Sequence, residues 1–128
     1  PTPVLMIKSA INKGLDGICF TDHLDYDYKE EPGLFDLDIA AYEKRIKKIA
    51  IALKEKGCPV NIHWGIEIGL QPHITEKNNE VTKKYPFDLV IGSSHVVNGI
   101  DPYYPVFYKG KTEHEAYTEY FESILDNL

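Results

Sequence analysis

Three side chains of the types that bind metal ions lie inside or directly after short apolar segments. They are His23, Glu67 and His95. Imidazole and carboxylate groups together suit Zn, Fe or Mn, and one carboxylate can bridge two ions. A glutamate in so apolar a segment is costly to bury unless it is paired or bound to a cation. The residues therefore predict a metal site, against the open alternative of two hydrogen-bonded loop histidines and a salt-bridged glutamate.

Helical and strand patterns alternate along the chain, which is typical of a parallel sheet with crossover helices. Apolar segments predict strands at residues 17–21, 60–70 and 88–92. Amphipathic segments predict helices that begin after Thr2, Asp38 and Thr112, and a shorter helix over 75–84. The carboxyl ends of parallel strands lie on one face. The three candidate ligands can therefore converge although they are far apart in sequence.

The composition fits one α/β domain over residues 1–128. With 128 residues the chain can bury a hydrophobic core without disulfides, but it is shorter than the about 250 residues of a complete parallel βα barrel. The net charge of −6 argues against nucleic acid and anionic membranes as partners. We expect no membrane span and no targeting segment. Cys19 and Cys58 lack CxxC spacing, which favours a reducing compartment, the cytoplasm.

Three short strings resemble the successive motifs of the PHP (polymerase and histidinol phosphatase) superfamily in order and spacing. They are TDH at 21–23, GIEIG at 65–69 and IGSSH at 91–95. The longer string IGSSHVVNGIDPYYP, together with GLQPH, resembles the histidinol-phosphatase branch. The similarity extends over essentially the whole chain.

This resemblance implies a distorted (β/α)7 barrel that holds up to three divalent metal ions, Zn, Fe or Mn, and hydrolyses phosphomonoesters. Carried over by motif, His23 and His95 become metal ligands and Glu67 a bridging ligand. Asp22 is expected to orient the neighbouring histidine without binding metal itself. In such chemistry the cations neutralise phosphate oxygens and lower the pKa of a bound water, which attacks phosphorus in line.

The sequence also departs from the family pattern. Family members open with a strand carrying a His-x-His motif, and they close with further ligand-bearing strands and basic residues for phosphate. None of these motifs is found in this sequence. The sequence therefore resembles a partial PHP barrel that lacks the first strand and the C-terminal units. We expect the chain alone to bind metal weakly and to have little or no phosphatase activity.

Two residues are candidates for contact with the substrate. Asp25 follows the first predicted strand, where an acid could pair with the amine of histidinol phosphate. A solvated turn is the alternative. Tyr103 lies in a stiff aromatic segment between two prolines and could stack on an imidazole ring. Packing against the next helix is equally compatible with the sequence.

The sequence thus favours a piece of a metal-dependent histidinol-phosphatase-like enzyme that converts histidinol phosphate to histidinol and phosphate in histidine synthesis. Its partner would be a small phosphomonoester, with no nucleic acid and no membrane. One alternative is another PHP phosphoesterase, acting on nucleotides or on phosphotyrosine in proteins. Another is a non-catalytic PHP module within a larger assembly. Retention of all three candidate ligands argues against the module, because a purely structural domain has no chemical need for them.

Overall fold

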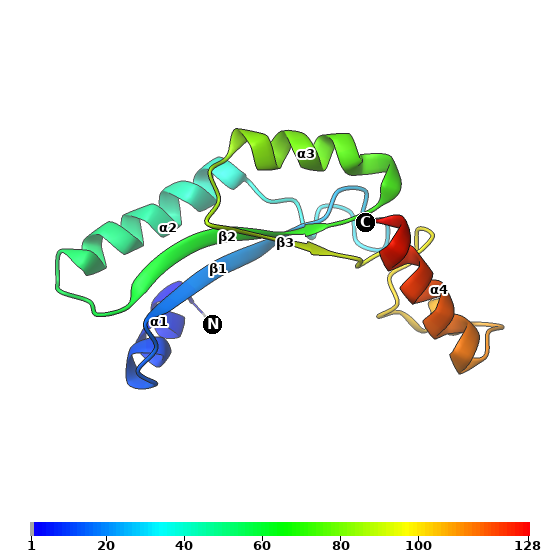
Figure 1. Ribbon diagram of the computed structural model, residues 1–128, viewed down its shortest axis with the longest axis horizontal. Coiled ribbons are helices and arrows are strands. Elements are labelled where there is room, and N and C mark those ends of the chain that lie inside the picture. The colour runs from blue at the N-terminus through cyan, green and yellow to red at the C-terminus, as the bar shows by residue number, and fades with distance from the viewer. Residues whose placement is uncertain (1) are drawn as a thin grey trace. The chain divides into compact units, whose positions relative to one another are not determined.

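The computed structural model describes residues 2–128 and contains one three-stranded sheet (Figure 1). The strands are parallel and hydrogen-bonded in the order β1 (Gly17–Leu24), β2 (Asn61–Gly69) and β3 (Leu89–Ser93). Helix α2 (Ile39–Lys54) connects β1 to β2, and α3 (Thr75–Lys84) connects β2 to β3. Helix α1 (Pro3–Asn12) precedes the sheet and α4 (Glu113–Asp126) follows it. This order confirms the predicted α/β class with crossover helices.

The contacts within the chain divide it into two compact units, and every strand begins in the first unit and ends in the second. The first unit comprises the chain up to Asp22 together with 37–66 and 87–91. The second unit comprises 23–36, 67–86 and 92–128. The carboxyl ends of all three strands, where the sequence predicts the candidate ligands, thus belong to the second unit.

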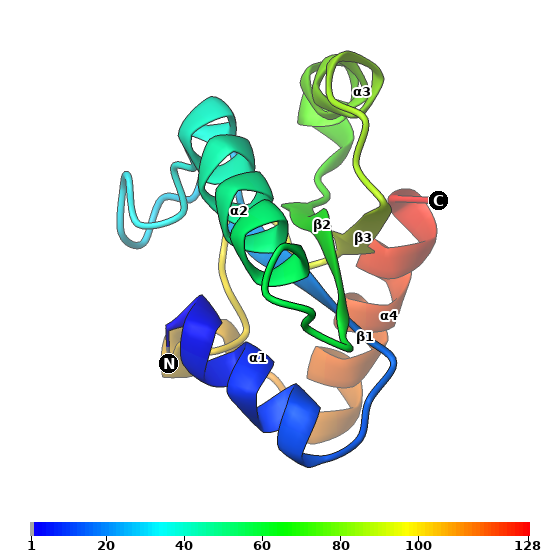
Figure 2. The same cartoon turned by 90° about the vertical axis from the view of Figure 1, so that its left-hand side faces the viewer.

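The first unit is organised around α2, which runs alongside β1 and β2 (Figure 2). The Asp38 side chain caps α2 by accepting a hydrogen bond from the Ala41 amide at 3.0 Å. On the buried face of α2, the Tyr42 hydroxyl lies 2.7 Å from the Phe20 carbonyl and 2.9 Å from the Gly65 carbonyl. These contacts fasten the helix to both strands. Burial raises the pKa of Tyr42 to about 12.

The second unit has its own small core, to which α4 contributes. Val97, Phe107 and Ala116 are buried there, and Ile100 and Tyr120 pack against them. Thr112 and Glu115 form the predicted capping box at the start of α4. Two short 3₁₀ helices, Pro72–Ile74 and Pro105–Tyr108, precede α3 and α4. No helix within residues 2–128 combines the length and apolar character that crossing a membrane requires.

The predicted boundaries hold closely except at the end of β1. The pattern ends the first strand at Thr21, whereas the strand continues to Leu24. The sequence turns polar at Asp22, but the ladder depends on backbone groups and continues past that point. His23 is therefore part of the strand. Because side chains alternate along a strand, His23 and Asp22 project from opposite faces.

Candidate metal centre

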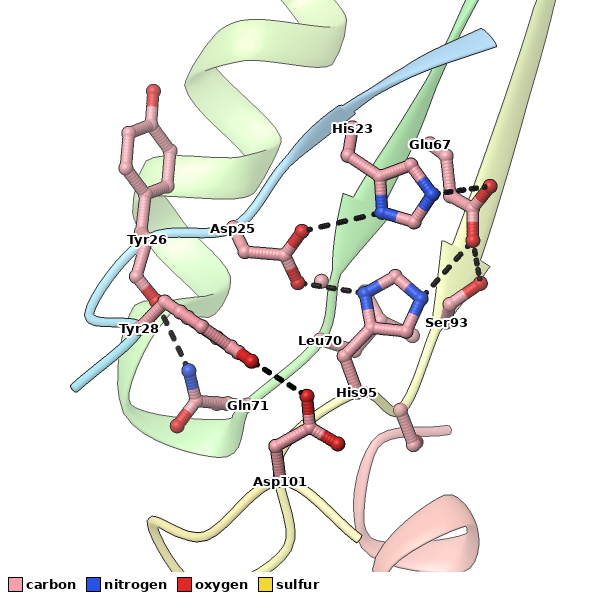
Figure 3. A network of polar contacts seen from close by, with 12 residues as sticks. His23, Asp25, Tyr26, Tyr28, Glu67, Leu70, Gln71, Ser93, His95 and Asp101 are labelled. Atoms are coloured by element: carbon pink, nitrogen blue, oxygen red, sulfur yellow. Dashed lines mark hydrogen bonds and ion pairs between the residues drawn. The ribbon is translucent and has the colours of Figure 1, made fainter. Parts of the chain in front are cut away.

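Two histidines and two carboxylates meet at the strand ends of the second unit (Figure 3). His23 and Asp25 come from the end of β1, Glu67 from the end of β2, and His95 follows β3. His95 Nδ1 lies 2.6 Å from Asp25 Oδ1, and His95 Nε2 lies 3.0 Å from Glu67 Oε1. His23 repeats the arrangement at 3.6 Å from Asp25 Oδ2 and 3.5 Å from Glu67 Oε2. The structure thus brings together all three residues that the sequence singled out.

The two imidazole rings form the centre of this cluster. They are stacked with their centroids 4.9 Å apart and an angle of 21° between their planes. Both rings direct Nδ1 toward Asp25 and Nε2 toward Glu67, so one carboxylate lies on each side of the stack (Figure 3). Phe35 flanks the His23 ring at 5.4 Å and closes the stack on one side.

The hydrogen-bonding groups of this cluster do not balance while the His95 ring is neutral. An ionised carboxylate only accepts hydrogen bonds, so the His95 nitrogen that faces Asp25 must carry a proton. In a neutral ring, Nε2 then turns a lone pair toward the Glu67 oxygen, and two acceptors face each other at 3.0 Å. A further proton or a metal ion between them removes the conflict. The hydrogen bond that His95 donates to Asp25 raises the pKa of His95, although burial opposes the shift.

Asp25 gives a second indication that a cation belongs here. Its side chain is only 2% exposed, and Oδ2 is buried without a hydrogen-bond partner among the described residues. A buried carboxylate oxygen without a partner is costly, and a nearby positive charge lowers that cost. Single ligand atoms of His23, Asp25 and His95 lie within 4.8 Å of one another. Two imidazoles and one carboxylate this close together fit a divalent ion such as Zn, Fe or Mn, and Glu67 contacts both rings from the other side.

Ser93 belongs to the same cluster and was not singled out from the sequence. Its hydroxyl donates a hydrogen bond to Glu67 Oε1 at 2.9 Å. The sequence analysis did not consider this contact, although alternation along an extended segment places residues 93 and 95 on one face. That alternation was the available signal. The hydroxyl holds the Glu67 carboxylate in a fixed orientation.

Asp22 occupies a different environment from the one expected of a residue that orients His23. Its carboxylate pairs with Arg45 at 2.8 Å within the first unit, and its side chain is 42% exposed. The alternation of β1 explains this, since neighbouring strand residues point to opposite faces. From this part of the chain, the carboxylate that contacts both histidines is that of Asp25, two positions beyond His23.

The predicted substrate contacts of Asp25 and Tyr103 stay predictions. Asp25 is buried with its carboxylate directed at the two histidines, so its position indicates a role toward them. Tyr103 is 84% exposed and borders a cavity of about 380 Å³ that also reaches His95. Asp101 and several aromatic rings line the same cavity.

Comparison with known proteins identifies the family of the chain. A family model of the PHP domain matches residues 2–128. The chain belongs to the PHP domain family. It is 34% identical over 122 residues to a probable histidinol-phosphatase of Clostridium acetobutylicum and, over the same length, to the histidinol-phosphatase of Lactococcus lactis subsp. lactis. These alignments cover 93% and 94% of the chain.

A solved structure gives the same result for the fold of this PHP-domain chain. The crystal structure of histidinol phosphate phosphatase from Lactococcus lactis subsp. lactis, complexed with Zn, L-histidinol and phosphate, matches it with a TM-score of 0.87 and 33% identity. The match covers 98% of this chain and 46% of that chain. The chain likewise spans 44% and 43% of the two curated relatives. The predicted family and the partial PHP-barrel fold are confirmed.

Proposed function

We propose that the whole protein containing this chain is a metal-dependent phosphomonoester hydrolase that converts histidinol phosphate to histidinol and phosphate in L-histidine synthesis. The observation that carries the proposal is the cluster of metal-ligating side chains, in which single ligand atoms of His23, Asp25 and His95 lie within 4.8 Å of one another beside Glu67. The relative crystallised with Zn, L-histidinol and phosphate supports the choice of substrate. The unpaired thiols of Cys19 and Cys58 support the cytoplasm as its location.

We assign His23, His95 and Glu67 as the metal ligands that this chain contributes, with Glu67 able to bridge two ions through its two oxygens. A divalent ion bound there supplies positive charge to phosphate oxygens and lowers the pKa of a bound water. The chain's own residues prepare the site for it. Ser93 holds the Glu67 carboxylate by a hydrogen bond, and the stacked rings hold both Nε2 atoms on one side. The other ligands and the groups that bind phosphate are proposed for the rest of the protein.

The cavity beside His95 supports an aromatic, cationic substrate. The rings of Tyr103, Phe107 and Tyr120 border it, and Asp101 adds a carboxylate. Such walls suit an imidazole ring, and the acid suits an ammonium group. We propose that Tyr103 stacks on the imidazole of histidinol phosphate, because its ring is exposed and borders the cavity.

The decisive experiment is a steady-state comparison of substrates with the whole protein after loading with Zn²⁺ or Mn²⁺. We expect kcat/KM for histidinol phosphate to exceed that for nucleoside monophosphates and for a phosphotyrosine peptide by about 100-fold, since the competitors leave the polar wall groups unpaired. A reversed order would assign the protein to another PHP phosphoesterase. Absence of metal-dependent turnover on every substrate would identify a non-catalytic module.

A further inference from the structure

The Asp25 carboxylate lies between the Nδ1 atoms of two stacked histidines. Oδ1 receives the hydrogen bond from His95 at 2.6 Å, slightly shorter than the about 2.7–2.9 Å usual for charge-assisted N–H···O bonds. Oδ2 lies 3.6 Å from His23 Nδ1, beyond hydrogen-bond length, and has no hydrogen-bond partner among the described residues. A shift of the His23 ring by a few tenths of an ångström would complete the second bond.

Gly69 provides the space that this carboxylate occupies. A Cβ atom at Gly69 would lie 2.1 Å from Asp25 Oδ1 and 2.8 Å from its Cγ. Both distances are shorter than real contacts, so any larger residue must push the carboxylate away from the histidines. Gly69 does not adopt a left-handed backbone conformation. Glycine is therefore needed at position 69 because a side chain there would collide with the Asp25 carboxylate.

We infer that Asp25 is a positioning residue: its buried carboxylate, seated against Gly69, fixes the protons of His23 and His95 on Nδ1 and thereby presents both Nε2 atoms to a divalent cation beside Glu67. The inference rests on the proposed function for the existence of that cation. Histidine ligands of metals commonly donate their second N–H to a carboxylate, which sets the tautomer and the orientation of the ring.

Burial separates this role from direct metal binding by Asp25. The Asp25 side chain is 2% exposed, whereas Glu67 on the other side of the stack is 21% exposed and the His23 ring 42%. An incoming ion reaches the Nε2 side first. Asp25 Oδ1 accepts the bond from His95, and Oδ2 lies on the same buried side, 3.6 Å from His23 Nδ1.

Zn²⁺ affinity of the whole protein, measured without substrate by competition with a chromogenic chelator, tests the inference. We expect Asp25→Ala and Gly69→Ala to weaken Zn²⁺ binding by about 10–100-fold, the usual loss when the partner of a histidine ligand is removed. Asp25→Asn should lose less, since its amide oxygen still accepts from His95. Asp27→Asn is the matched control, because Asp27 contacts the exposed His73 in the same unit, and it should bind as wild type. Affinity within twofold of wild type for Asp25→Ala would overturn the inference.

Two further measurements separate positioning from general support of the fold. In the metal-free protein, two-bond ¹H–¹⁵N spectra report which imidazole nitrogen carries the proton. We expect His95 to be protonated at Nδ1 in wild type and in Asp25→Asn, and to lose that preference in Asp25→Ala. Unchanged tautomers in every variant whose far-UV circular dichroism matches wild type would overturn the inference.

A crystal structure of the Zn²⁺-loaded protein gives the third readout. Asp25 oxygens hydrogen-bonded to both Nδ1 atoms would support the inference. An Asp25 oxygen at the about 2.0–2.2 Å of a Zn–carboxylate bond would replace it with direct ligation. None of the three readouts uses histidinol phosphate. The inference can therefore stand if the protein proves to hydrolyse another phosphomonoester, and it can fail while the proposed substrate is correct.

Discussion

The polar contacts of the two units differ in how well donors and acceptors match. In the first unit, the Tyr42 hydroxyl meets two strand carbonyls, and the Trp64 amide donates to the Asp88 carboxylate at 2.9 Å. In the second unit, the Asp25 and Glu67 carboxylates enclose two imidazoles, and Asp25 Oδ2 is buried without a hydrogen-bond partner among the described residues. The first arrangement is complete as it stands. The second becomes complete only with added positive charge.

This difference separates a polar cluster that stabilises the fold from one that we propose binds a cation, both on a shared set of strands. The same three strands supply both regions. Matched donors and acceptors stabilise the sheet and its helix, and they create no demand for a ligand. Excess buried acceptors cost stability, which is typical of sites built to bind a cation. Substitutions in the two regions should therefore affect different measurements.

The largest effect is expected from Glu67→Gln. The amide keeps the size of the side chain but removes the negative charge that faces both histidines. Loss of metal-dependent charge stabilisation worth several kcal/mol should lower kcat/KM for histidinol phosphate by about 10³-fold. Steady-state assays of the whole protein measure this loss of kcat/KM. Glu43→Gln, which removes the partner of Lys47 on α2, is the control and should keep full activity. A loss below tenfold for Glu67→Gln would place the chemistry elsewhere.

A pair of histidine substitutions tests the comparison within the second unit. His95 lies between two carboxylates, whereas His73 contacts only Asp27, at 3.0 Å, and is 57% exposed. Removing a metal ligand should lower Zn²⁺ affinity more than removing the carboxylate that orients the ligand. We therefore expect His95→Asn to weaken Zn²⁺ binding by at least about 100-fold. His73→Asn should change it less than twofold, because an exposed ion pair is screened by water. Calorimetric titration of both variants measures the difference, and equal losses would refute it.

Metal removal should destabilise the second unit. A ligand that binds only the folded state at about 100 times its dissociation constant adds about 2.7 kcal/mol of stability. We expect dialysis against a chelator to lower the free energy of unfolding of the whole protein by about that amount, and Zn²⁺ to restore it. Urea unfolding with and without metal measures the change. His95→Asn should lose most of the increment, and an increment that survives this substitution would mean that the ion binds outside the cluster.

Local signals were sufficient to predict most of the fold. Thr2, Asp38 and Thr112 each cap a helix as predicted, because a cap depends on residues within one turn. The three strands were also found, the first and third from short apolar segments and the second from alternating apolar and polar residues. The end of β1 was misplaced, because its last residues are polar and are held by the neighbouring strand.

The candidate site was predicted in part, and the missing part depends on tertiary neighbours. His23, Glu67 and His95 were identified by residue type, position and family motif. The roles of Asp25 and Ser93 depend on which side chains face them from other strands, and a single sequence does not display those contacts. The motif places Asp22 next to His23 along the chain, but the alternation of the strand directs Asp22 to the opposite face and Asp25 comes to contact both histidines.

The smallest effect, and the one that isolates the first unit, is expected from Tyr42→Phe. The change leaves two buried carbonyls without the hydroxyl donor and should lower the free energy of unfolding by about 1–3 kcal/mol. Zn²⁺ affinity should stay within twofold of wild type, since the hydroxyl contacts only first-unit groups. Urea unfolding and chelator competition provide the two readouts. A large loss of metal affinity would show that the two regions are energetically coupled.

The raised pKa of Tyr42 gives the same substitution a pH signature. Tyrosine ordinarily ionises near 10, and burial raises the pKa here to about 12. Below pH 10 the hydroxyl is protonated in the folded and the unfolded chain, so its contribution to stability is fully present. As the pH rises from 10 toward 12 the unfolded chain ionises first, and the contribution declines until it is lost above the folded pKa. Stability of wild type should therefore converge on that of Tyr42→Phe between pH 10 and 12, and a constant difference across this range would contradict the assignment.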